Sequence, residues 1–415
     1  MTAPARIPFP VVDEVSRHCL QEAEPETVHI EVHLPGTLDQ ARLRKAFLEA
    51  LHRHPRILMR EARGPLYRRR YEWELTPEPD VEVVTFAPPG PRALRDARTR
   101  ALADAPPLSA SPPIRLEVVD SVLLLTINHT ALDGPACLRV LATAAELYGG
   151  RDNAPAAPPV RAPQALQEAA DTPAGWSPPA RVARGTPDPS PGNGMLVTEL
   201  PLPHRPKGSP YTVNDQLMVT TALTIAHWNR EHGARPRPLR ITMPVDDRPR
   251  DTTMPIGNGT RLVEVPYGPQ ELDVTDMPAL LRRTAERTRA LKSLPRPQLG
   301  HGAALLTTPW APVTARAALT RALRRAAAPW TSTTLLSNIG RIPYPLDFGE
   351  EAGRAHAVWF SAPARMPRGL TVTTASTAGR LHLALRWSKA LLSHGDGAHL
   401  RDLFEHYLHT TEVTA

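Results

Sequence analysis

The sequence predicts an α/β protein with two structured lobes, one on each side of a proline-rich linker. Three observations predict this class. Strand-like alternation of apolar residues and helix-like spacing of three and four both occur in each half of the chain. Ten prolines fall between Pro155 and Pro191, where no apolar periodicity survives. The length of 415 residues is enough for two or three compact units.

The first half opens with a strand and a helix. In TVHIEVHL, apolar residues alternate with polar ones, which predicts a half-buried strand with His29 and His33 on its polar face. Apolar residues then recur at helical spacing from Leu43 to Leu51, and Pro55 ends the predicted helix. Short strands are predicted near 56–61, 66–74 and 81–86, a helix near 91–104, and a hairpin of 113–119 with 121–127.

The second arm of that hairpin differs from the other predicted strands. It is apolar on both faces from Val122 to Ile127, which predicts a central strand of a sheet. A helix is predicted at 135–148, because Pro135 suits a first helical turn, where its missing N–H is not needed.

The second half repeats the mixture of strands and helices. Thr212 and Asp215 form a capping-box pattern that predicts a helix start, and Gly233 marks the end of that helix. The other predicted elements are strands near 195–201, 239–245, 260–266, 332–337 and 356–361, helices near 277–292, 310–328 and 396–410, and a hairpin of 370–376 with 380–387.

Composition argues against several classes of protein. The net charge is +7 and the isoelectric point is near 9.8, but only four of the 49 basic residues are lysines, and the arginines are scattered. Aromatic residues make up 5% of the chain, so no stacking surface is evident and nucleic-acid binding is not predicted. The chain has no run of about 18 apolar residues and no signal-peptide pattern at its start. We therefore expect no membrane span and a cytoplasmic location.

Motifs for metals and bound cofactors are missing from the sequence. Cys19 and Cys137 form neither a disulfide framework nor a metal site. His406 and His409 share one helix face but lack acidic partners at ligand spacing, so no metal site is predicted. No Walker phosphate loop, dinucleotide-binding glycine pattern or nucleophile elbow occurs. The sequence therefore predicts no permanently bound cofactor.

One histidine stands out by its position. His129 follows the apolar strand directly, and Asp133 and Gly134 come next, before the predicted helix. A rigid strand fixes the direction of the side chain at its end, so His129 is a candidate catalytic residue. The same spacing fits an ordinary strand-to-helix turn, with Asp133 as the helix cap and Gly134 in the turn. Spacing alone leaves both alternatives open.

The stretch NHTALDG, residues 128–134, resembles the His-His-x-x-x-Asp-Gly motif of the superfamily of condensation domains and CoA-dependent acyltransferases. Asn128 stands at the place of the first histidine, which favours a free-standing enzyme over a module of a peptide synthetase. The segment DFGEE partly resembles a motif of the plant branch but lacks its tryptophan, and it is interpreted as a structural loop. Further resembling pieces follow in family order: ALHRHPRIL, TVNDQLMVTTALTIAHW, ITMPVDDRPR with GNGTR, and TTLLSNIGRIP.

The resemblance implies a fold of two chloramphenicol-acetyltransferase-like lobes in one chain, with an active-site tunnel between them. The N-terminal lobe is expected at 1–148, the crossing between the lobes at 149–192, and the C-terminal lobe at 193–415.

The resemblance also implies roles for individual residues. His129 is expected to act as the general base, since imidazole takes up protons near neutral pH. Asp133 is expected to pair with Arg248 and to hold the turn that Gly134 permits. Ser337 and Asn338 are expected to line the tunnel or to donate to an oxyanion, with a strand-end cap as the alternative for both.

The expected reaction transfers an acyl group from a thioester of CoA or of a carrier protein to a hydroxyl or amine of a small molecule. The enzyme would act as a monomer in natural-product biosynthesis. One alternative is a cyclisation, elimination or rearrangement on the same fold. Another is a non-catalytic partner of a biosynthetic assembly line.

Overall fold

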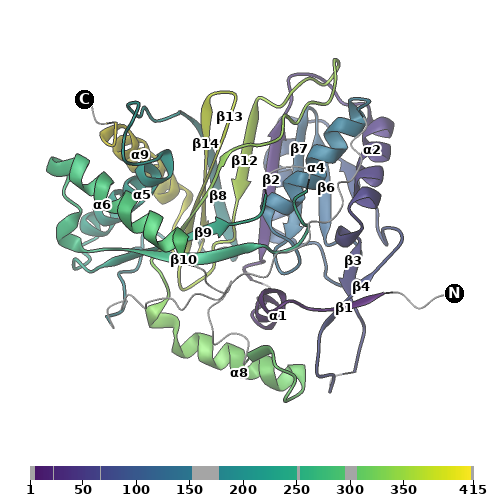
Figure 1. Cartoon of the computed structure of the whole chain (residues 1–415), viewed down its shortest axis with the longest axis horizontal. Coiled ribbons are helices and arrows are strands. Elements are labelled where there is room, and N and C mark those ends of the chain that lie inside the picture. Colours follow the sequence, from purple (N-terminus) through teal and green to yellow (C-terminus); the bar gives the residue numbers. More distant parts are fainter. Residues whose placement is uncertain are drawn as a thin grey trace.

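In the part of the chain that the structure describes, three β-sheets and the helices that cover them make up a mixed α/β fold (Figure 1). The computed structural model describes residues 5–21, 23–65, 67–151, 177–249, 253–294 and 306–412. The mixed α/β class predicted from the sequence is confirmed. None of the helices in these ranges combines the length and the apolar character that a bilayer crossing requires.

A five-stranded sheet is the scaffold of the first half. Its central strand is β7 (Val122–Asn128), which is buried along its whole length, as its apolar sequence predicted. Helices α2 (Gln40–Arg53) and α4 (Gly134–Tyr148) cover one face of the sheet, and α3 (Ala93–Ala103) packs on the other. The strands run in the order β12 (Ala357–Ser361), β2 (Thr27–His33), β7, β6 (Ile114–Val119), β5 (Val84–Phe86).

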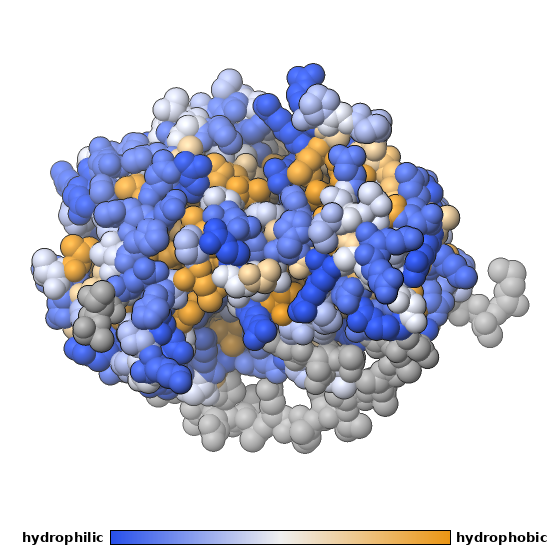
Figure 2. Space-filling view, turned by 90° about the horizontal axis from the view of Figure 1, so that it is seen from above, coloured by the Kyte–Doolittle hydropathy of each residue, from blue (hydrophilic) through white to orange (hydrophobic). Residues whose placement is uncertain are grey.

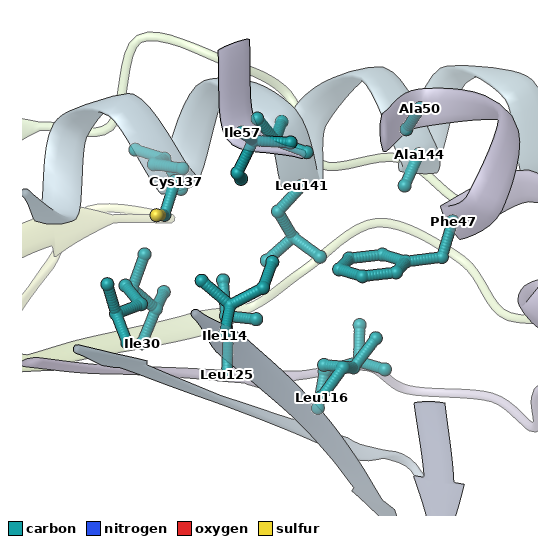
Figure 3. Packing of buried hydrophobic residues seen from close by; sticks show 14 of the residues in the cluster. Ile30, Phe47, Ala50, Ile57, Ile114, Leu116, Leu125, Cys137, Leu141 and Ala144 are labelled. Carbon is teal, nitrogen blue, oxygen red and sulfur yellow. The ribbon is translucent and has the colours of Figure 1, made fainter. Parts of the chain in front are cut away.

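The core of this half lies between the sheet and helices α2 and α4. Figure 3 shows Ile30 and Leu125 on the sheet beneath Cys137 and Leu141 of α4, with Phe47 of α2 beside them. All five side chains are at most 1% exposed. This packing holds α4 against β7, and it therefore fixes the turn between them.

The prediction for β2 is wrong on one point, because both faces of this strand are covered. His29, expected on a polar face, is 2% exposed, and its Nε2 lies 2.9 Å from the Ala101 carbonyl of α3. Burial lowers the pKa of His29 to about 3, so the ring is neutral at physiological pH. On the same face, Arg98 of α3 binds the buried Glu31 carboxylate. The polar residues of β2 thus face a helix rather than solvent.

A six-stranded sheet is the scaffold of the second half. Its strands run in the order β10 (Thr260–Tyr267), β9 (Leu239–Asp246), β11 (Thr334–Arg341), β13 (Leu370–Thr377), β14 (Arg380–Ser388), β8 (Asn193–Pro201). Strand β11 runs parallel to both of its neighbours, and the other pairs are antiparallel. Helices α5 (Val213–Glu231), α6 (Met277–Ser293) and α9 (His394–Thr410) pack on this sheet (Figure 1).

The N-terminus forms elements that the sequence patterns did not predict. Helix α1 (Val11–His18) packs against α8 (Val313–Ala326), which comes about three hundred residues later. The strand predicted at 66–74 begins later than expected, as β4. The third sheet has the order β1 (Arg6–Pro8), β4 (Glu72–Leu75), β3 (Met59–Glu61), and short 3₁₀ helices cover Pro55–Ile57, Pro269–Glu271, Val274–Asp276 and Ala328–Trp330.

The two halves share one strand. β12 lies in the second half of the sequence, but it pairs antiparallel with β2 in the five-stranded sheet. Phe348, in the segment that leads to β12, is buried against Tyr148 of α4, so DFGEE is part of a packed loop.

Of the predicted crossing 149–192, residues 152–176 lie outside the described residues. Seen from above, the surface is mostly hydrophilic, with apolar patches toward its middle (Figure 2).

Candidate active site

The turn between β7 and α4 is closed by Asn128. Its Oδ1 accepts from the backbone N–H of Thr130 at 3.1 Å, and its Nδ2 donates to the Pro106 carbonyl at 2.9 Å. The Asn128 side chain is buried, and both its oxygen and its nitrogen bond to backbone groups. Asn128 therefore supports the turn, and the next residue, His129, is the one that the turn presents.

His129 lies in the wall of a cavity, and one of its ring nitrogens has a hydrogen-bond partner in the protein. Its Nδ1 is 3.0 Å from the carbonyl oxygen of Leu132. A carbonyl accepts hydrogen bonds and cannot donate them, so Nδ1 carries the proton and Nε2 carries the lone pair in the neutral ring. The backbone N–H of His129 also donates to the Glu26 carbonyl oxygen at 2.8 Å, which anchors the residue to the strand end. These backbone contacts thus fix the tautomer and the position of the imidazole.

Asp133 is the N-cap of α4 and has no role as a free acid. Its Oδ1 accepts from the Ala136 N–H at 3.0 Å, and its Oδ2 accepts from the Gly259 N–H at 2.8 Å. Oδ2 also accepts from Arg248 Nη2 at 2.7 Å, which is the contact that the resemblance implied. Because Asp133 is 2% exposed and bonded on both oxygens, it holds the turn in place.

Gly134 has a different purpose from the one expected. It is the first residue of α4, and its φ is not in the left-handed region, so the turn does not require glycine for its backbone angles. A Cβ atom at this position would lie 3.2 Å from the Phe360 ring and 3.4 Å from Val28. Glycine at this position avoids these tight contacts, since α4 starts next to β12 and β2.

Arg248 joins the turn to the end of β9. Its guanidinium donates to both oxygens of Asp246, at 2.9 and 2.8 Å, and to the Gly257 carbonyl at 2.9 Å. Burial disfavours the charge on Arg248, but Asp246 and Asp133 outweigh this effect and raise the pKa of the guanidinium. A Cβ on Gly259 would lie 2.3 Å from Arg248 Nε, so this glycine makes room for the side chain.

A buried carboxylate that the sequence patterns did not single out lies behind the turn. Asp13 of α1 is 3% exposed and accepts from Trp73 Nε1 and from Asn258 Nδ2, each at 2.9 Å. Asn258 Nδ2 also lies 3.3 Å from the His129 carbonyl and 3.1 Å from that of Thr130. Burial raises the pKa of Asp13 to about 6, against the lowering effect of its hydrogen bonds and of Arg56 and His129.

The cavity has a volume of about 310 Å³ and takes its wall from both halves of the chain. His129, Asp133 and Gly134 line it from the first half, and Ser337 and Asn338 of β11 line it from the second. Asn338 Oδ1 accepts from the Gly340 N–H at 2.9 Å, and Nδ2 donates to Asn214 at 3.2 Å. The structure therefore brings Ser337 and Asn338 into the same cavity as His129.

The two cysteines and the histidine pair of α9 are not among the residues that line the cavity. Cys19 and Cys137 are both buried, and burial raises the pKa of the Cys137 thiol well above its usual value. Within the described ranges, no three His, Cys, Asp or Glu side chains are grouped closely enough to hold a metal ion. His406 and His409 lie on exposed parts of α9.

Comparison with known sequences identifies relatives without an assigned activity. No family model matches the chain. The uncharacterized proteins MT2362 and Rv2305, from two strains of Mycobacterium tuberculosis, are each 30% identical to it over 377 residues. These matches cover 82% of this chain and 84% of each relative.

Comparison with solved structures shows what the fold is similar to. The first condensation domain of the CDA synthetase matches with a TM-score of 0.67 and 15% identity, over 98% of this chain and 96% of that chain. The trichothecene 15-O-acetyltransferase TRI3 of Fusarium sporotrichioides matches with a TM-score of 0.65 and 11% identity, over 98% of this chain and 96% of that chain. The starter condensation domain of rhizomide synthetase RzmA, a mutant in complex with C8-CoA, matches with a TM-score of 0.65 and 14% identity. The match covers 98% of this chain and 95% of that chain.

Proposed function

Because the chain belongs to one family with Rv2305 and, by its fold, to the superfamily of condensation domains and CoA-dependent acyltransferases, we propose that it is a thioester-dependent acyltransferase. It moves an acyl group from CoA or from a carrier protein to a hydroxyl or amine acceptor. The observation that carries this proposal is His129, a histidine with its lone pair on Nε2, in the wall of a cavity.

In the proposed mechanism His129 acts as general base and then as general acid. Nε2 takes the proton of the acceptor O–H or N–H while the acceptor atom attacks the thioester carbonyl. The C–S bond of the tetrahedral intermediate then breaks, and the imidazolium returns the proton to the departing thiolate. The products are an ester or amide and a free thiol. The hydrogen bond from Nδ1 to Leu132 stabilises the imidazolium in between.

Asn338 and Ser337 are proposed to stabilise the oxyanion of that intermediate. An amide nitrogen has two N–H bonds, and Asn338 uses one of them on Asn214. The other N–H is available for the negative oxygen that forms as the acceptor attacks. Asp133 and Arg248 are proposed as positioning residues, since their contacts hold the turn rather than the substrate.

We also propose the lobes 1–148 and 193–415, joined by the crossing 149–192, with the cavity as a tunnel at their junction. Two observations support this division. The hydrophobic core separates into two main clusters, one around each large sheet. The cavity takes its wall from both. In this arrangement β12 is a strand that the second lobe contributes to the first.

The solved structures support the class of donor and product. TRI3 is named as a 15-O-acetyltransferase, which supports ester formation, and the RzmA domain is in complex with C8-CoA, which supports a CoA thioester as donor. CoA is then a co-substrate, with no permanently bound cofactor. The synthetase origin of several neighbours supports a place in natural-product biosynthesis.

Free-thiol release tests the proposal directly. Purified protein is incubated with acyl-CoA or acyl-carrier thioesters and with candidate alcohols and amines, and thiol is followed over time. We expect His129→Ala to lower the rate about 10²- to 10⁴-fold. The matched control is His406→Ala, on the exposed side of α9, which should release thiol like the wild type. Equal rates for His129→Ala and the wild type would show that the mechanism is wrong.

One neighbour favours a second candidate function. The epimerization domain from the third module of tyrocidine synthetase B has a similar fold, with a TM-score of 0.57 and 12% identity, so the fold also accommodates a reaction other than transfer. A cyclisation, elimination or rearrangement would give a product of unchanged composition without release of thiol. Unchanged pathway output with His129→Ala would instead indicate a non-catalytic partner.

A further inference from the structure

Three arginines from two segments lie together in the cavity wall. Arg324 belongs to α8, and Arg365 and Arg368 belong to the loop that follows β12. Burial lowers the pKa of both Arg365 and Arg368, and the charge of Arg324 lowers both further. We call this set the arginine cluster. It concentrates positive charge in a cavity that also holds His129.

One member of the arginine cluster is already neutralised. Arg365 is 6% exposed and forms an ion pair with Glu26, which also lines the cavity. It donates further to the carbonyl of Cys19 at 2.7 Å. Arg365 is thus held in place by protein groups, and the charges that need an explanation are those of Arg368 and Arg324.

Arg368 has polar contacts but forms no ion pair with any of the described residues. Its Nε and Nη2 donate to the Ser332 hydroxyl at 3.1 and 2.9 Å, and Nη2 lies 3.4 Å from the Thr242 hydroxyl. Among the described residues, no carboxylate lies within 4.0 Å of this guanidinium, and none accepts a hydrogen bond from Nη1. A partly buried cation without an ion pair is uncommon, because removal from water costs free energy that a counter-charge normally offsets.

The surroundings of Arg368 favour an incoming anion. Burial lowers the pKa of Arg368 to about 10, Glu264 partly opposes this, and the charges of Arg324 and Arg181 lower it further. The side chain nevertheless keeps its charge at neutral pH. Arg324 is exposed at the cavity and forms no ion pair within the described part of the chain. A negative group at this place would meet two cations and would relieve their mutual repulsion.

We propose that Arg368, assisted by Arg324, binds an oxyanion of the substrate, either a carboxylate or a phosphate, in the same cavity as His129. The Ser332 hydroxyl occupies Nε and one N–H of Nη2, so the guanidinium is held in orientation while Nη1 is left to donate. The wall also includes Val12, Phe360 and Pro363, so a largely apolar substrate with one anionic group fits it. That the anion belongs to a substrate rests on the proposed function, but the binding of an anion by Arg368 does not depend on turnover.

Two sources could supply such a group. A carboxylate could belong to the acyl chain or to the acceptor, and a phosphate could belong to the phosphopantetheine arm of the thioester. Both place an oxygen anion opposite a guanidinium fork, so the chemistry of recognition is the same. The probes of the experiment are chosen to separate them.

Calorimetric titration of the full chain with octanoate, octyl phosphate and the neutral analogue octanamide tests the proposal. In the wild type, at least one of the two anions should bind roughly ten- to one-hundred-fold more tightly than octanamide. Arg368→Gln should abolish this difference, Arg324→Gln should reduce it, and Arg368→Lys should retain part of it. The matched control is Arg325→Gln, next to Arg324 on α8 but away from the cavity wall, which should bind like the wild type. Thermal unfolding of each variant checks that it is folded.

The outcomes separate the sources and the two proposals. Tighter binding of octyl phosphate, with displacement by CoA, assigns the arginine cluster to the thioester arm. Tighter binding of octanoate, without displacement by CoA, assigns it to a substrate carboxylate. The inference is overturned if neither anion binds more tightly than octanamide, or if the preference survives in folded Arg368→Gln. The titration measures binding without turnover, so loss of anion binding and loss of thiol release are distinguishable failures.

Discussion

The Asp133 carboxylate accepts a 2.7 Å hydrogen bond from Nη2 of Arg248, a residue 115 positions later in the chain. Both groups are almost fully buried, and Asp246 is the second carboxylate on the same guanidinium. The contact connects the turn that carries His129 with the end of β9. The position of the proposed base therefore depends on a charged network between the two halves of the sequence.

Arg248→Gln should destabilise the protein and slow thiol release. The substitution leaves Asp133 and Asp246 as two buried carboxylates without a counter-charge, which costs about 3–5 kcal/mol of the free energy of unfolding. Urea denaturation measures this loss. The matched control is Arg380→Gln, an exposed arginine that pairs with Glu199, for which we expect less than about 1 kcal/mol. A loss for Arg248→Gln as small as that of the control would show that the network does not hold the turn.

Gly259→Ala should disturb the same network without removing a charge. The added Cβ would lie 2.3 Å from Nε and 2.4 Å from Cζ of Arg248, a side chain that its hydrogen bonds hold in place. We expect a loss of about 1–3 kcal/mol in the free energy of unfolding. Gly90→Ala is the control, since a Cβ there meets nothing within 4 Å and its φ is not in the left-handed region. Equal stability of the two variants would refute the packing argument.

Asp13→Asn should change how stability depends on pH. Burial raises the pKa of Asp13 from 3.8 to about 6 in the folded state. The folded protein therefore holds this proton more tightly than the unfolded chain, and stability falls as the pH rises through this range. Above about pH 6 the buried carboxylate is charged, at a cost of about 3 kcal/mol.

The measurement compares urea denaturation of wild type and Asp13→Asn from about pH 4 to about pH 7. The wild type should lose stability relative to the variant as the pH rises, because asparagine has no proton to release. A difference between the two proteins that stays constant over this range would contradict the raised pKa of Asp13.

Local patterns were sufficient for elements whose exposure follows from their own sequence. β7 is apolar on both faces and is the central strand, and α5 begins at the capping box of Thr212 and Asp215. Helix α1 has eight residues and is stabilised by distant contacts, such as that of His18 with Thr320, so its own pattern did not reveal it. The alternation in β2 showed which residues share a face, but only the position of α3 shows that this face is buried.

The residues of the site also divide into those that local patterns predict and those that only distant contacts reveal. The spacing of His129 and Asp133 marked the turn, and the resemblance supplied Arg248 as the distant partner. Asp13 could not be predicted, because its relation to the turn passes through Asn258, 245 positions away, and through no local pattern. Arg368 is one arginine among many in the sequence, and only the folded chain shows that it forms no ion pair with any of the described residues.

Strand β12 makes the two halves of this chain interdependent for folding. It pairs with the outer side of β2 from His29 to His33 and covers the backbone hydrogen-bonding groups there. A fragment that ended in the proline-rich segment would expose this row of hydrogen-bonding groups and the apolar side chains beneath it. An uncovered strand edge can pair with a strand of another molecule. Separated halves would therefore associate with their own copies unless the complementary half were present to compete.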